Sequence, residues 1–226
     1  MGIKKPNNER NWSKIFAIVF GIIFAFMFVG TYLLTILGST IFSPGIKPGD
    51  TVTADLTIRD GAGRSILTTD QSEYSRAMSA GYSVFFTPAL QIKANGTYNE
   101  TIIGVDAYFP PQWTKFGILL DEMEMIASGV VGMKEGERKT IDLSTIAILP
   151  QSFAAEDFEA SGGNFTSAKV GDQMVIGFRP AFSDELVGND TISYLYRVME
   201  IVGKDDQHVI LSHSYATADI KIRQIV

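Results

Sequence analysis

The feature that most constrains this chain is an uncharged apolar segment near its N-terminus. Residues 15–37 contain no charged side chain and are rich in Ile, Phe, Val and Leu. At about 1.5 Å per residue, a helix of this length spans a hydrocarbon core of about 30 Å. A cleavable signal peptide has an apolar stretch of only about 7 to 15 residues, although Leu37-Gly38-Ser39 could pass as a weak cleavage site. We therefore expect an uncleaved membrane anchor that contacts the lipid bilayer through residues 15–37.

The charges on either side of the anchor predict its orientation. Residues 1–14 carry four basic side chains and one acidic one, whereas the first charge after the anchor is Lys47. Because the more basic flank remains in the cytoplasm, the rest of the chain should be extracytoplasmic. Beyond Leu37 there are 15 Lys and Arg residues against 24 Asp and Glu residues. This acidic balance argues against nucleic acid as a partner.

Every asparagine beyond the anchor opens an N-glycosylation sequon. The four candidates for modification are Asn95, Asn99, Asn164 and Asn189. Ser and Thr account for 34 of the 226 residues, so four hits by chance have a probability of about 5 in 10,000. Glycosylation would place these residues on an exoplasmic face, which supports the orientation independently of the charges.

Composition limits the chemistry of the domain. Apolar residues make up 46% of the chain and charged residues 19%, which is typical of a globular protein. The absence of cysteine excludes disulfides, zinc–thiolate sites and a cysteine nucleophile. His208 and His213, the only histidines, should point to different faces. We therefore predict no metal and no cofactor.

The pattern of apolar residues predicts an α+β domain that is mostly antiparallel β. Residues 38–48 are interpreted as a stalk, 49–150 as the first part of the domain, 151–211 as an inserted module and 212–226 as the final strand. Residues 116–128 have helical spacing, with Gly129 placed to end the helix, and residues 150–168 are interpreted as a linker-like stretch. Strands are predicted at residues 51–58, 65–69, 139–143, 173–178, 194–202, 207–211 and 219–225.

Three segments, in this order along the chain, resemble the FKBP family of peptidyl-prolyl isomerases. They are Pro48-Gly-Asp-Thr-Val with Asp60-Gly61, the run Gly129-Val-Val-Gly-Met-Lys-Glu-Gly-Glu-Arg-Lys139, and Tyr196 to Gly203 followed by His208 to Ala216. The last is similar to SlyD-type members, which carry an insert-in-flap module before the final strand. Residues 71–115 have no counterpart in the family and are expected to form short strands and a long irregular excursion. The resemblance implies a half-barrel sheet with one short helix.

The resemblance implies a prolyl isomerase, a chaperone, or both, acting on unfolded or exported polypeptides. Such an isomerase lowers a barrier of about 20 kcal/mol by holding the twisted amide in an apolar pocket. The matching positions here are Leu56, Ile66, Leu67, Met123, Ile126, Leu149 and Ile220. The family's aromatic residues are aliphatic in this chain, and its Asp is Leu67. Two alternatives stay open: the domain is a catalytically inactive subunit of a membrane or cell-surface complex, or these seven residues are simply core.

Aromatic side chains form a second set of candidates, for binding a client polypeptide. Those in the excursion are Tyr108, Phe109 and Trp113, and those in the inserted module are Phe178, Phe182 and Tyr194. The alternative for the first group is that they cover the apolar side of the excursion or lie on the membrane surface. The alternative for the second is that they fill a small core of the module itself.

Overall fold

The computed structural model describes residues 12–41, 44–178 and 194–226. Phe182 and Asn189, predicted as a client-binding residue and a glycosylation site, lie outside these ranges. The chain divides into two units, Met1–Pro44 and Gly45–Val226. Each unit is described by itself below.

The first unit contains one long helix, α1 (Trp12–Ile41). Its segment Lys14–Leu33 is long and apolar enough to cross a membrane, a property that a signal sequence shares. Side chains such as Phe20 and Phe26 are 69% and 76% exposed. A continuous apolar surface of this kind is unfavourable in water, which fits either an anchor or a signal sequence. The helix extends through Gly38–Ile41, which the sequence had assigned to the stalk.

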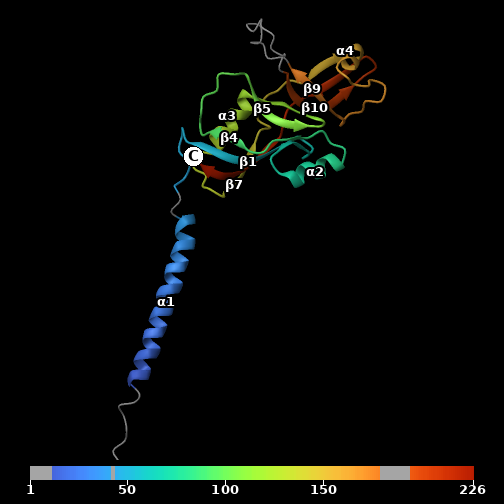
Figure 1. Ribbon diagram of the computed structural model, residues 1–226. Helices are drawn as coiled ribbons and strands as arrows, with labels where there is room; N and C mark the ends of the chain where they lie inside the picture. Colours follow the sequence, from blue (N-terminus) through green and yellow to red (C-terminus); the bar gives the residue numbers. More distant parts are fainter. Residues whose placement is uncertain (1–11, 42–43, 179–193) are drawn as a thin grey trace, which may run out of the picture. The chain divides into compact units, whose positions relative to one another are not determined.

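The second unit is built on an open, mostly antiparallel sheet (Figure 1). The strand order is β7-β12-β1-β2-β3-β5-β6-β10-β11-β8, while β4 pairs with β1 and β9 with β10. Among the strand pairs of the described residues, only β2–β3 and β6–β10 are parallel. The bounds are β1 Thr51–Arg59, β2 Ser65–Thr68, β3 Phe85–Phe86, β4 Leu90–Lys93, β5 Ile102–Phe109, β6 Gln112–Leu119, β7 Arg138–Asp142, β8 Gln151–Ala154, β9 Gln173–Phe178, β10 Leu195–Lys204, β11 His208–Ser212 and β12 Thr217–Ile225. The fold class is therefore α+β, as predicted.

Strand β1 shows how the sequence produces the two faces of this sheet. Buried and half-buried residues alternate along its whole length. Val52, Ala54, Leu56 and Ile58 are at most 1% exposed, because every second side chain of a strand points to the same face. The polar residues between them face outward. This outer face carries the groove described below.

Helix α3 (Leu120–Gly129) packs its apolar residues into the core beneath the sheet. Gly129 lets the helix end approach β7 closely, because a Cβ there would lie 2.2 Å from Ile141 Cδ1. The prediction that the helix begins at Phe116 is wrong: Phe116–Leu119 belong to β6. Three successive residues of β6, from Phe116 to Ile118, are buried, so the strand lacks the alternation that would distinguish it from a helix.

The excursion contains more regular structure than the sequence indicated. Helix α2 (Gln71–Ser79) begins at Asp70, whose Oδ1 accepts hydrogen bonds from the backbone N–H groups of Ser72 and Glu73 at 2.7 and 3.2 Å. Strands β5 and β6 form a hairpin that joins the main sheet. The expected long irregular excursion is therefore wrong.

The predicted boundaries need two further corrections. Residues 150–168, expected to be linker-like, contain β8 and helix α4 (Ala155–Ala160). Gly45 begins the folded unit, four residues before the predicted start, because Ile46 is 2% exposed and exchanges backbone hydrogen bonds with Met133 and Gly132. The region of β8–β11 has a small core cluster of its own around Phe158.

Candidate functional site

The residues expected to line an isomerase pocket belong to the core of the sheet. Six of them are at most 2% exposed and lie in one core cluster: Leu56, Ile66, Leu67, Met123, Ile126 and Ile220. The seventh, Leu149, is 83% exposed and lies outside this cluster. The six side chains contact one another and their neighbours instead of solvent. They therefore offer little apolar surface to a proline ring.

A buried ion pair joins α3 to β10. Glu122, in the first turn of α3, and Arg197, on β10, are each 1% exposed. Arg197 Nη1 donates to Glu122 Oε2 at 2.8 Å, and Nη2 donates to Oε1 at 2.7 Å. The guanidinium also donates to the carbonyls of Gly117 and His213, each at 2.8 Å. This bidentate arrangement with two further acceptors compensates the charge of a group removed from water.

Tyr215 completes the cluster around Arg197. The guanidinium carbon lies 4.4 Å from the centre of the Tyr215 ring, and the ring packs on Phe116 with 6.2 Å between ring centres. Tyr215 Oη donates to the Val198 carbonyl at 3.1 Å. Burial raises the pKa of Tyr215, so the phenol remains protonated near pH 7.

The charge states of the cluster follow from the same geometry. Burial lowers the pKa of Arg197, but Tyr215 and Glu122 raise it by more, so the net shift is upward. Burial and the positive charge of Arg197 lower the pKa of His213, which is therefore neutral near pH 7. The guanidinium of Arg197 stays charged, and both of its Nη atoms are paired, whereas its buried Nε has no hydrogen-bond partner among the described residues. The cluster is thus suited to fixing structure rather than to acid–base chemistry.

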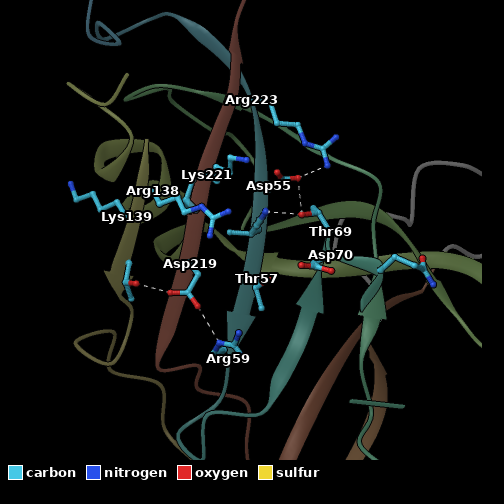
Figure 2. A pocket seen from close by; sticks show the side chains of 14 residues that line it. Asp55, Thr57, Arg59, Thr69, Asp70, Arg138, Lys139, Asp219, Lys221 and Arg223 are labelled. Atoms are coloured by element: carbon cyan, nitrogen blue, oxygen red, sulfur yellow. Dashed lines mark hydrogen bonds and ion pairs between the residues drawn. The ribbon is translucent and has the colours of Figure 1, made fainter. Parts of the chain in front are cut away.

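A polar groove lies on the outer face of this sheet, shown in Figure 2. It has a volume of about 720 Å³ and is lined by residues of β1, β7 and β12 and by the segment Thr69–Gln71. Leu56 and Ile220 contribute to its floor, although their side chains point into the core. The groove therefore lies on the opposite side of the sheet from the predicted pocket.

The groove carries both signs of charge. Arg59 pairs with Asp219, with 3.1 Å between Nε and Oδ2, and Arg223 pairs with Asp55. Thr69 Oγ1 also donates to Asp55, at 3.2 Å. These contacts hold the two acidic side chains against the strands. The only sequence signal for this groove is the set of polar residues that alternate along β1 and β12.

The predicted client-binding aromatics have different environments. Phe109 stacks on Phe85 with 4.7 Å between ring centres, and Tyr108 packs against the cluster of Tyr74, Ala77 and Val84. Phe178 is half-buried against the small core around Phe158, whereas Tyr194 is 45% exposed.

Trp113, next to Tyr108, is 59% exposed. Among the predicted aromatics of the excursion, Trp113 thus presents the largest free surface.

Three of the four sequon asparagines lie in the described part of the chain, and all three are exposed: Asn95, Asn99 and Asn164. Asn95 has a positive φ of 50°, in the turn after β4.

His208 Nδ1 lies 3.4 Å from Asp205 Oδ1. Residues 12–41, 44–178 and 194–226 contain no group of three or more His, Asp or Glu side chains placed to bind a metal ion.

Comparison of the chain with protein-family models and with curated proteins finds no match.

Proposed function

We propose that this chain is a membrane-anchored FKBP-like protein whose extracytoplasmic domain binds partners and does not catalyse prolyl isomerisation. The family resemblance is supported by the antiparallel order β7-β12-β1-β2 and by the packing of α3 against the core of this sheet. The strands of this group contain or adjoin the first two segments that resemble the family, whereas Tyr196 to Gly203 of the third lies in β10. The partners are exported polypeptides or other subunits of a membrane complex.

The burial of the expected pocket carries the proposal. An isomerase of this kind must hold a prolyl amide in an apolar, water-poor cavity. In this chain six of the seven matching side chains are at most 2% exposed, and Arg197 and Glu122 are buried in the same region. Opening such a cavity would expose buried apolar side chains to water, at a cost in free energy.

Three features support the extracytoplasmic location. The segment before α1 is basic, the first charge after it is Lys47, and the sequon residues Asn95, Asn99 and Asn164 are exposed. Exposure is necessary for modification by an oligosaccharyl transferase. We propose that α1 is an uncleaved anchor with its N-terminal end in the cytoplasm.

The test is a protease-free prolyl isomerisation assay on the full-length protein in detergent micelles, beside the fragment that starts at Gly45. This fragment contains all the described core residues, so it should fold without α1. We expect no acceleration over buffer. An acceleration that changes in the Ile126→Val variant would refute the proposal, because it would come from this core. An acceleration that is the same for the wild type and for Ile126→Val would come from a contaminating isomerase.

A chaperone activity is the second candidate, favoured by the 59% exposure of Trp113 at the β5–β6 hairpin. Wild-type protein should then suppress the aggregation of an unfolded client, and Trp113→Ser should weaken this effect. Val170→Ser is the matched control, since Val170 is 64% exposed in another loop. Equal suppression by both variants would exclude Trp113 as the client contact.

A further inference from the structure

The outer groove contains two cations that form no hydrogen bond or ion pair with the described residues. Arg138 on β7 and Lys221 on β12 are neighbours in the register of these two strands, and both line the groove. Among residues 12–41, 44–178 and 194–226, neither side chain has a hydrogen bond or an ion pair. Figure 2 shows them side by side on the same face of the sheet. Two adjacent, unpaired cations form a site of positive potential.

The acidic side chains of the groove form their ion pairs and hydrogen bonds with other residues. Asp55 and Asp219 are engaged by Arg223 and Arg59. Asp70 caps α2: the hydrogen bonds from the Ser72 side chain and backbone, and to a smaller extent the charges of Arg76 and Arg138, keep its pKa below the usual value. In total, five basic and three acidic residues line the groove, although the part of the chain after the anchor is strongly acidic. The positive groove is therefore a local exception to the charge of its surroundings.

Building on the proposed binding function, we infer that this groove binds an acidic polypeptide segment, with Arg138 and Lys221 contacting its carboxylates. A guanidinium and an ammonium group both donate charge-assisted hydrogen bonds to carboxylate oxygens. A ligand with closely spaced phosphates, such as an anionic lipid surface, would also meet Asp55, Asp70 and Asp219 and be repelled. A peptide can place separate carboxylates at the cations and uncharged residues at these positions.

The test compares three peptides of about ten residues by fluorescence anisotropy: one rich in Asp and Glu, one with Lys in place of the acids, and one with Asn and Gln. The fragment from Gly45 is used beside the full-length protein in micelles. We expect only the acidic peptide to bind, with an affinity that falls as salt is raised. The double variant Arg138→Gln/Lys221→Gln should bind it at least tenfold more weakly.

Two further variants make the result specific. The charge-reversed Arg138→Glu/Lys221→Glu protein should prefer the Lys peptide, a reversal that a general loss of stability would not produce. Lys47→Gln/Lys169→Gln is the matched control, because both lysines are exposed and lie outside the groove. This control removes the same charge and should retain wild-type affinity.

The possible negative results distinguish an error in the groove assignment from an error in the proposed function. Unchanged acidic-peptide binding by the Arg138/Lys221 variants would overturn the groove assignment and leave a binding protein. Binding of vesicles with anionic lipid, or of inorganic phosphate, without peptide binding would also overturn the peptide inference. Acceleration of prolyl isomerisation would instead refute the proposed function, whatever the peptides do.

Discussion

Removal of the buried arginine tests most directly whether the core is closed. In Arg197→Met, the carboxylate of Glu122 would remain in a site that is 1% exposed, without its bidentate partner. Breaking a buried pair from one side costs about 3 to 5 kcal/mol. For a domain of this size, that corresponds to a decrease in melting temperature of about 6 to 20 °C.

The double variant Arg197→Met/Glu122→Leu removes both charges. Replacing a buried pair with apolar residues of similar volume is often neutral or stabilising. The carbonyls of Gly117 and His213 lose a donor in the single and the double variant alike, so this loss cancels when the two are compared. The backbone N–H of Leu119 loses its acceptor, Glu122 Oε2, in the double variant alone, which costs about 1 kcal/mol and is smaller than the cost of the unpaired carboxylate. We therefore expect the double variant to be more stable than Arg197→Met.

Urea unfolding of the fragment from Gly45, followed by circular dichroism, measures these free energies. Arg223→Met is the matched control: it breaks the ion pair with Asp55, whose two side chains are 47% and 29% exposed. That loss should be at most about 1 kcal/mol. A loss of the same size for Arg197→Met, or a double variant no better than the single one, would show that water reaches Glu122. The proposed closed core would then be wrong.

Three other perturbations have defined outcomes. A hydrogen bond from Ser72 lowers the pKa of Asp70 in the folded protein. The carboxylate of Asp70 therefore stabilises the fold fully above the unfolded pKa of about 3.9, and this stabilisation is lost as the pH falls toward the folded pKa. The difference in unfolding free energy between wild type and Asp70→Ala should shrink below pH 4. Gly129→Ala should destabilise the domain by about 1 to 3 kcal/mol, less so with Ile141→Ala, as measured by urea unfolding. Asn95→Gln should remove one glycan-sized step on a gel after expression in a glycosylating host, and an unchanged band would mean that Asn95 is not modified.

The strands were predictable where one face of the sheet is buried and the other is not. Strand β1 alternates strictly, and a period of two fixes both the strand and its faces. The turn at Asp60 was also readable, because its side chain accepts hydrogen bonds from the N–H groups of Ala62 and Arg64 at 3.0 and 2.8 Å.

The short helices were missed because their apolar faces are narrow. Helix α2 buries Tyr74 and Ala77, and helix α4 buries Phe158. One or two apolar residues produce no helical period. For α2 a local signal did exist: Asp70 followed by Glu73 resembles a helix N-terminus, and Asp70 does accept the expected hydrogen bonds.

The Arg197–Glu122 pair could not be predicted from the sequence. The two residues are 75 positions apart, and charged side chains are rarely buried. Glu122 alone would be interpreted as a favourable charge in the first turn of a helix.

The glycines opposite each other in the β5–β6 hairpin, Gly104 and Gly117, permit the close approach of β10, since a Cβ on Gly104 would lie 2.9 Å from Leu195 Cδ2. Such a close packing depends on the whole sheet.

The aliphatic pocket residues and the buried pair have a common physical explanation. A salt bridge is stable in the core only while water is excluded and each hydrogen-bonding group is satisfied. The aliphatic side chains are buried in the core, the ring of Tyr215 covers the guanidinium of Arg197, and Phe116 packs on that ring. Both observations describe an inner face from which water is excluded. Because the inner face is closed, we propose the charged outer face, with Arg138 and Lys221, as a surface on which this sheet binds a partner.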